Sequence, residues 1–261
     1  MQVYKSSIFG EVPQPDKFEE LISLSLHPAP DKTRAVRMWR GQSSIDWPVH
    51  SAAFRKLKLS NSSVDEMDMQ YYEKDLLARA THRGFRLVDG RDLSDFDLLA
   101  RLQQHGAATR LVDFTRNALT ALWFAVASEA KLTGALLGIH AHSIGGYEGL
   151  PENRLYDEIF PNLAKHDHPQ TWEPPAVTPR IAAQHAQFVY SDVVNRRSGS
   201  LKLPKKPKEL LVVALSPDIK QRFSTILSEV FDIRYSTLFP DIDGFGRANS
   251  VHFSRREIYR W

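Results

Sequence analysis

The chain has 261 residues, of which 42% are hydrophobic and 25% are charged, a composition typical of globular proteins. Lysine and arginine exceed aspartate and glutamate by only 34 − 31 = 3, which permits an anionic partner without requiring one. The absence of cysteine excludes disulfides, thiolate metal sites and a cysteine nucleophile, and it suits a cytoplasmic protein. We find no signal-peptide pattern at the N-terminus and no apolar run near the length of about 18 residues that a membrane helix needs, so we expect no membrane association.

The predicted elements of the first part of the chain are mostly helices. A short helix is expected over residues 16–26, and the strand after it covers residues 35–39. An amphipathic helix is expected over residues 62–79, where apolar residues at helical spacing follow an acidic start. Another helix, residues 95–104, is expected to end at His105 and Gly106, because glycine readily adopts the left-handed cap.

Short strands and buried helices follow one another in the rest of the chain. Helices of the length found between parallel strands are few, which favours one α+β domain with a mixed, mostly antiparallel sheet and flanking helices. Loops are expected over residues 143–179, in a basic segment at residues 195–209 and in a turn-rich tail at residues 237–247. The predicted strands cover residues 110–114, 134–140, 187–190 and 210–215, and the predicted helices cover residues 118–131 and 216–230.

The segment MWRGQ places Arg40 at the end of a predicted strand, directly before Gly41. A guanidinium beside a backbone without a side chain suits bidentate recognition of a phosphate or carboxylate. The alternative is an ordinary surface arginine that precedes a turn.

The segment QQHGAATRLVDFTRNALTALWFAVA gathers polar groups between a strand and a buried helix. Asp113 and Thr115 point to the same side of the strand and could bind a ribose or an amide. They could equally cap the following helix together with Asn117. Arg110 is expected to pair with Asp113 or Asp97, whereas His105 fits the end of a helix better than the role of a base.

The segment WEPPAVTPRIAAQHAQF holds Glu173 before two prolines, which keep its backbone extended. Its carboxylate could orient a hydroxyl or stabilise a cation, or it could simply be solvated. Arg180 and Gln184 are four residues apart and would share a helix face.

Several other chemistries find no support in the sequence. The motifs of P-loop NTPases, Rossmann proteins and α/β-hydrolases are missing, and the pairs His140/His142 and His166/His168 lack zinc-site spacing. We therefore expect no metal site. A nuclease that holds Mg²⁺ through carboxylates remains an alternative, although PDIDG is also typical of a turn. Its candidate ligands are Asp113, Asp241 and Asp243.

Taken together, MWRGQ, the long second segment, WEPPAVTPRIAAQHAQF and LFPDIDG resemble the FRG domain family, named for an aromatic-Arg-Gly motif. The resemblance spans residues 36–244 and implies a helical extension over residues 1–34 and an FRG domain over residues 35–261. The chain departs from the family pattern at Ala107 and Ala108, and within residues 185–188, where a glycine usually precedes the phenylalanine.

A more distant resemblance is to ADP-ribosyltransferases, in which an arginine at a strand end, a second strand leading into a buried helix and a later glutamate act on NAD. It implies that fold, NAD as substrate and an unknown protein or nucleic-acid acceptor, and FRG proteins of bacteria and phages suggest a toxin or antiphage-defence role. The implied catalytic residues are Arg40, Glu173 and Gln184. The implied NAD-binding residues are Arg40, Gly41, Gln42, His105, Thr109, Arg110, Asp113, Thr115 and Arg180.

A binding module without catalysis is the main alternative. The same polar groups would then recognise a nucleotide, a nucleic acid or a phage protein. A basic stretch suits phosphates, although such a stretch is also typical of a solvated loop. Its residues are Arg196, Arg197, Lys202, Lys205, Lys206 and Lys208.

Overall fold

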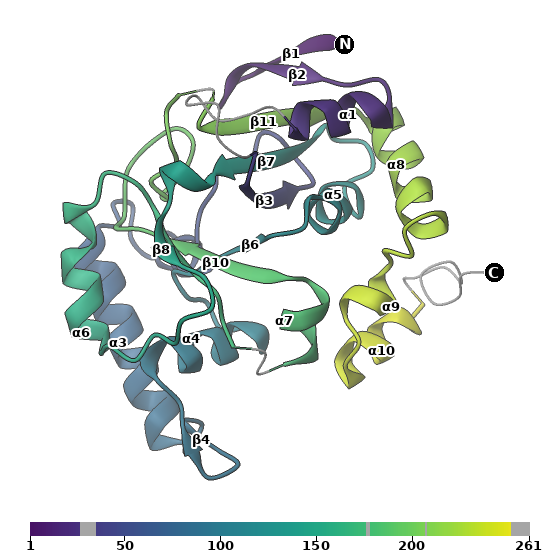
Figure 1. Ribbon diagram of the computed structural model, residues 1–261. Helices are drawn as coiled ribbons and strands as arrows, with labels where there is room; N and C mark the ends of the chain where they lie inside the picture. The colour runs from purple at the N-terminus through teal and green to yellow at the C-terminus, as the bar shows by residue number, and fades with distance from the viewer. Residues whose placement is uncertain (27–34, 176–177, 207, 252–261) are drawn as a thin grey trace.

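Seven strands form one curled sheet, which the computed structural model places at the centre of the α+β fold that the sequence predicts (Figure 1). The structure describes residues 1–26, 35–175, 178–206 and 208–251. Every neighbouring pair of strands is antiparallel except β8 and β9, so the sheet is mixed and mostly antiparallel. In spatial order the strands are β11 (Leu210–Leu215), β7 (Gly134–His140), β3 (Arg37–Gln42), β6 (Val112–Thr115), β10 (Ala186–Tyr190), β9 (Gln170–Trp172) and β8 (Gly145–Tyr147).

The sheet opens between β3 and β6. Strand β3 pairs with β7 along its whole length, but among the described residues it shares only the pair Trp39–Thr115 with β6. The opening divides the sheet into a part with β11, β7 and β3 and a part with β6, β10, β9 and β8. The side chains at this opening can therefore line a space between the two parts of the sheet.

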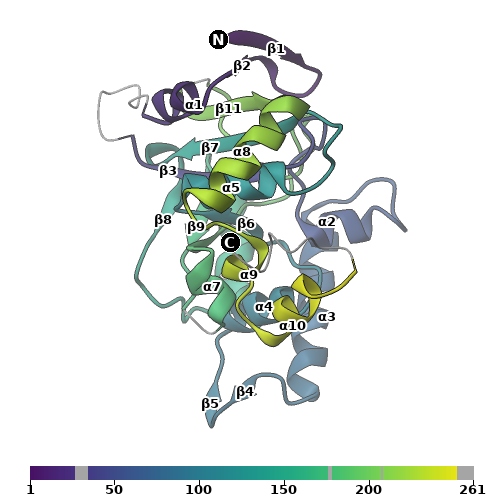
Figure 2. The same cartoon turned by 90° about the vertical axis from the view of Figure 1, so that its right-hand side faces the viewer.

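Three helices, α1 (Phe18–Ser25), α5 (Ala118–Val126) and α8 (Pro217–Glu229), gather beside the first part of the sheet (Figures 1 and 2). Asn117 starts α5 by accepting hydrogen bonds from the N–H groups of Leu119 and Thr120. The apolar faces of the three helices bury a core that includes Trp39, Leu136 and Phe223. This packing fixes α5 directly against β3.

The second part of the sheet packs on a different set of helices. The helices α3 (Glu66–His82), α4 (Asp95–Gln104) and α6 (Tyr156–Ile159) and the 3₁₀ segment η2 (Phe160–Lys165) contribute to this core. Aromatic rings dominate it, with Phe96 between the rings of Phe160, Trp172 and Tyr190. A rigid aromatic core of this kind fixes the strands that form one side of the opening.

Several elements were not expected from the sequence. A hairpin precedes α1 within residues 1–34, and the predicted loop at residues 143–179 contains short strands and helical turns. The tail is not merely turn-rich, because Asp241 starts a helix by accepting the N–H of Gly244. Among the described residues, no helix has the length and apolar composition needed to cross a membrane. The further elements are β1 (Gln2–Ser6), β2 (Gly10–Gln14), α2 (Ala52–Leu57), β4 (Leu87–Val88), β5 (Arg91–Asp92), η1 (Ala141–Ser143), α7 (Pro179–Ala183), α9 (Tyr235–Leu238) and α10 (Ile242–Ala248).

The basic segment at residues 195–209 is only partly exposed. Leu201 and Leu203 are buried in a core cluster, and Lys202 is buried while it pairs with Asp192 at 2.7 Å. The expectation of an exposed basic loop therefore holds only in part, because Arg197, Lys205, Lys206 and Lys208 are exposed while the apolar residues between the basic ones anchor the segment to the core.

His185 occupies the turn between α7 and β10 with a φ of +46°, in the region that favours glycine. A glycine, which the family pattern has shortly before the phenylalanine, would adopt this conformation without strain. We expect His185→Gly to raise the free energy of unfolding by about 0.5–1 kcal/mol, since it relieves the left-handed strain at a surface position. Urea unfolding measures the change. Ala183→Gly is the control within α7 and should lower stability by about 1 kcal/mol, and an equal loss in both variants would contradict the expectation.

Candidate functional site

A cleft of about 320 Å³ lies at the opening between β3 and β6. One wall comes from β3 and α5, another from α4 and β6, and a third from α7 and the residue after α9. The cleft brings together six residues predicted for the site, which come from three separate segments of the chain. The lining residues are Trp39, Arg40, Gly41, Gln103, Gln104, Asp113, Phe114, Thr115, Ala121, Phe124, Arg180, Gln184, Ala186 and Phe239.

Arg40 bridges the opening of the sheet. Its Nη1 donates to the backbone oxygen of Asp113 at 2.7 Å, and its Nε donates to Oε1 of Gln42 at 3.2 Å. Gln42 is buried and is itself fixed through Nε2 to the backbone oxygen of Trp47. Burial lowers the pKa of Arg40, and Asp113 partly offsets this shift. The guanidinium is thus held in place, while its Nη2 makes no hydrogen bond to the described residues.

Gly41 allows α5 to lie directly on β3. A Cβ at this position would be 1.8 Å from the backbone oxygen of Ala121 and 2.6 Å from the backbone nitrogen of Ala125. No side chain fits in that space without moving the helix. The glycine after Arg40 is therefore required by close packing of backbone on backbone at the floor of the cleft.

Asp113 presents a carboxylate to the cleft and belongs to a chain of hydrogen bonds. Gln103 donates to its Oδ1 at 2.7 Å, and the hydroxyl of buried Thr109 donates in turn to Oε1 of Gln103. Asp113 is exposed where it lines the cleft. Desolvation is the largest cause that raises the pKa of its carboxyl, with Arg40 and Gln103 acting in the opposite direction.

We expect Asp113→Asn to be more stable than the wild type at neutral pH. A pKa raised by folding means that Asp113 favours the folded state when protonated and loses this contribution as the pH rises through the folded pKa. Asparagine keeps the oxygen that accepts from Gln103 but carries no charge. Urea unfolding from neutral to acidic pH should show an advantage that vanishes below the ordinary aspartate pKa of about 3.9. A variant less stable at neutral pH would contradict this expectation.

The third wall ties the cleft to the end of the chain. The Thr115 hydroxyl donates to the backbone oxygen of Gln184 at 2.7 Å, and Gln184 donates through Nε2 to the backbone oxygen of Leu238 at 3.0 Å. Arg180 forms a two-point ion pair with Asp241, with Nη2 at 2.8 Å from Oδ1, and it lies over the ring of Phe239. The Thr115 hydroxyl and the Gln184 side-chain amide therefore hold this wall in place.

Five of the predicted residues do not line the cleft. Glu173 pairs with Arg116 at 2.9 Å and accepts the N–H of Gly149 at 2.8 Å. His105 is exposed at the end of α4, as the sequence predicts for a helix end. Gln42 and Thr109 stand behind the lining residues and position Arg40 and Gln103. The fifth is Arg110, which binds Glu73 instead.

Arg110 is buried in a polar network away from the cleft. Its Nε and backbone N–H donate to Glu73 at 2.5 and 2.6 Å, and Nη1 donates to Glu66 at 2.9 Å. Nη2 donates to the hydroxyl of Tyr156, which donates to Glu73. Burial alone would lower the pKa of Arg110, but these partners more than reverse the shift and raise it. The expected pairing with Asp113 or Asp97 is thus replaced by one with α3, and the guanidinium does not reach the cleft.

Sequence reasoning missed Gln103 and Phe239 as site residues. Both lie in the segments that carry the FRG resemblance, but nothing local distinguishes them from a helix-end glutamine and a core phenylalanine. The carboxylates of the nuclease alternative are also placed: Asp241 is held by Arg180, and Asp113 by Gln103. Among the described residues, no three histidine, aspartate or glutamate side chains are grouped to hold a metal ion.

Comparison with known families agrees with this part of the structure. The model of the FRG domain matches residues 36–133, a segment that contains β3, α3, α4, β6 and α5. No curated protein and no solved structure matches the chain. The matched segment supplies Arg40, Gly41, Gln103, Asp113 and Thr115 to the cleft, whereas the wall formed by α7 and Phe239 lies beyond it. The chain therefore carries an FRG domain at residues 36–133, and the aromatic-Arg-Gly motif of that domain forms the edge of the cleft.

Proposed function

We propose that the cleft binds NAD and that the protein cleaves the bond between nicotinamide and ribose, as an ADP-ribosyltransferase or NAD glycohydrolase. The observation that supports this proposal is the convergence of six predicted residues on one cleft at the opening of the sheet. The volume of the cleft is near the lower end of the range of about 300–1,000 Å³ for small-molecule sites, so it would enclose the nicotinamide and its ribose.

Arg40 and Asp113 would carry the chemistry. The free Nη2 of Arg40 would donate to the pyrophosphate, because a guanidinium suits charged phosphate oxygens. Nicotinamide leaves with the electron pair of the bond to C1′, and the ribose becomes an oxocarbenium ion that Asp113 would stabilise electrostatically. Water or an acceptor then adds at C1′ and loses a proton. Asp113 suits this role better than Glu173, which is held by Arg116.

The first experiment is nicotinamide release from NAD by the purified protein, with and without EDTA. Release in both conditions would support the proposal, and the search would turn to a protein or nucleic-acid acceptor. A saturable rise in melting temperature with NAD but without release would favour a binding module that does not cleave the dinucleotide. The absence of both nicotinamide release and a rise in melting temperature would contradict the proposal. Cleavage of a nucleic acid that is seen only without EDTA would favour the nuclease alternative instead.

A second experiment addresses the biological setting. Loss of NAD is harmful to a cell, so the proposed activity would suit the toxin or antiphage-defence role that the FRG resemblance implies. Expression in bacteria should then lower cellular NAD together with growth. Growth inhibition at a constant NAD level would separate toxicity from the proposed reaction.

A further inference from the structure

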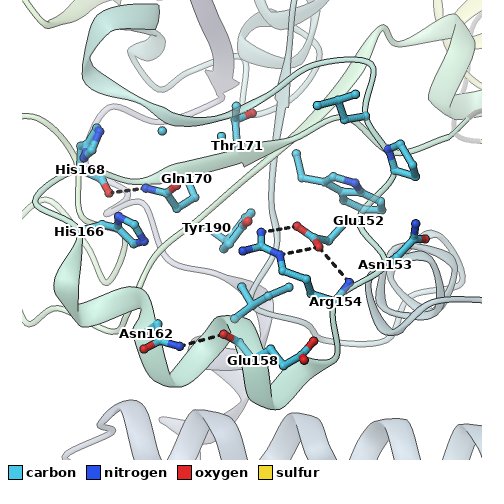
Figure 3. Close-up of a pocket in the computed structure, with 16 residues that line it drawn as sticks. Glu152, Asn153, Arg154, Glu158, Asn162, His166, His168, Gln170, Thr171 and Tyr190 are labelled. Carbon is cyan, nitrogen blue, oxygen red and sulfur yellow. Dashed lines mark hydrogen bonds and ion pairs between the residues drawn. The ribbon is translucent and has the colours of Figure 1, made fainter.

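A second cavity, of about 850 Å³, lies beside the outer strands β8 and β9 and the end of β10 (Figure 3). It shares no lining residue with the cleft at the opening of the sheet. Its volume is within the range of about 300–1,000 Å³ that is usual for small-molecule sites. The cavity is therefore a separate candidate site, independent of the proposed reaction with NAD.

Tyr190 is the central observation. Its side chain is only 4% exposed, and its ring packs against Phe96 and Phe160, yet its hydroxyl makes no hydrogen bond to any described residue. The hydroxyl oxygen is not one of the fully buried polar atoms, so the otherwise buried side chain opens its hydroxyl into the cavity. Burial also raises the pKa of Tyr190, so the hydroxyl stays protonated and can both donate and accept. A ligand in the cavity would supply the missing partner.

Gln170 lies directly opposite Tyr190 in the pairing of β9 with β10, so the two side chains leave the sheet on the same face. Its Nε2 reaches only the backbone oxygen of His168, at 3.4 Å, and its Oε1 has no partner among the described residues. Gly145 on β8 leaves the space that this amide needs, because a Cβ there would be 2.5 Å from both amide atoms. The edge strand β8 thus leaves room for the Gln170 amide, which adds a donor and an acceptor to those of the Tyr190 hydroxyl.

The charges and rings of the cavity limit the class of ligand. Arg154 binds Glu152 through Nε at 2.9 Å and Nη2 at 2.6 Å, and Glu158 adds a second carboxylate to the lining (Figure 3). Two carboxylates against one guanidinium disfavour an anion such as a phosphate. The ring of Trp172, only 3% exposed, packs in the core and offers no open face on which a base could stack.

We propose that this cavity binds an uncharged, polyhydroxylated small molecule of the sugar class. The Tyr190 hydroxyl, the Gln170 amide and the Glu152–Arg154 pair provide donors and acceptors for its hydroxyl groups, and Leu150, Pro151 and Ile159 provide apolar contacts. These protein groups require a ligand whose hydroxyls donate and accept hydrogen bonds, and they do not require a charge on the ligand.

The test is saturation-transfer NMR on the full chain with ribose, glucose and maltose as probes, and with inorganic phosphate added as an anionic competitor. At least one sugar should bind saturably, and Tyr190→Phe should weaken its affinity by about three- to tenfold, the loss expected for one neutral hydrogen bond. Tyr190→Phe should leave the response to NAD unchanged, since Tyr190 lies outside the cleft. No saturable binding by the three sugars, equal binding by the variant, or loss of the sugar signal when phosphate is added would overturn the proposal.

A matched pair of variants checks the premise about the hydroxyl. Tyr190→Phe should not lower the melting temperature, because no protein partner is lost. Tyr156→Phe removes a buried hydroxyl bonded to both Arg110 and Glu73, and it should lower the melting temperature by several degrees. An equal loss in the two variants would identify the Tyr190 hydroxyl as a structural group and would contradict the proposal.

Discussion

Replacing Arg110 with methionine is expected to lower the free energy of unfolding by about 3–5 kcal/mol. The substitution leaves the carboxylate of Glu73, which is fully buried, without its cation. It also removes the donors to Glu66 and Tyr156 and the contact of the guanidinium with the ring of Phe160. Urea unfolding followed by circular dichroism measures the loss.

Two further variants separate the buried charge from other effects. Arg79→Met removes an exposed pair with Asp75 and should cost no more than about 1 kcal/mol. The double variant Arg110→Met/Glu73→Gln removes both buried charges and should recover at least about 1 kcal/mol relative to the single variant. If Arg110→Met costs no more than Arg79→Met, or if the double variant recovers nothing, the buried charge of Glu73 is not what makes the loss of Arg110 costly. The double variant also keeps the test valid if the single one fails to fold.

Arg110 also shows where prediction from sequence ends. Its near neighbours suggest a pair with Asp113 or Asp97, but the carboxylate that binds it lies 37 residues away on α3. Nothing in the pattern around Glu73 indicates that this acid is buried, since its helix carries acids on several sides. A long-range ion pair between a helix and the segment before β6 depends on how the two pack, which a local pattern does not contain.

Elements with a strong local signal were predicted well. The helix α4 and the strands β7 and β11 have the predicted bounds, because a capping serine, an apolar run or a glycine marks each end. The short helices α9 and α10 were missed for a related reason. Helices of four and seven residues are not stable alone, and they form here through contacts such as Arg180 with Asp241.

The candidate cleft was predicted in part. Arg40 was predicted from a strand end and Asp113 from its position on the same side of a strand as Thr115, and both line the cleft. The strand β3 continues to Gln42, so Arg40 lies within it and not at its end. Glu173 was singled out because prolines hold it extended, but backbone stiffness does not reveal that Arg116 would take its carboxylate. The contribution of Phe239 depends on the return of the chain end to the opening of the sheet, which no local pattern shows.

Arg40→Ala is expected to lower kcat/KM for nicotinamide release by about 100-fold, the upper part of the range for a hydrogen bond to a charged group. The variant loses the Nη2 donor proposed to bind the pyrophosphate, and it also loses the bridge from β3 to the backbone of Asp113. Arg40→Lys keeps the charge but not the fork that joins Gln42 and Asp113, so we expect an intermediate loss of about tenfold. Steady-state release at several NAD concentrations measures both effects.

Arg55→Ala is the matched control, because this exposed arginine acts electrostatically on both Arg40 and Asp113 but does not line the cleft. It removes the same charge, so a general effect of positive potential would lower release in both variants. A loss confined to the Arg40 variants, with unchanged melting temperatures, would place the effect in the geometry of the guanidinium. Unchanged release by Arg40→Ala would separate the aromatic-Arg-Gly motif from catalysis and leave Gly41 as its structural part. If the wild type binds NAD without cleaving it, the dissociation constant replaces kcat/KM, and the same order of variants is expected because the contact with the pyrophosphate forms on binding.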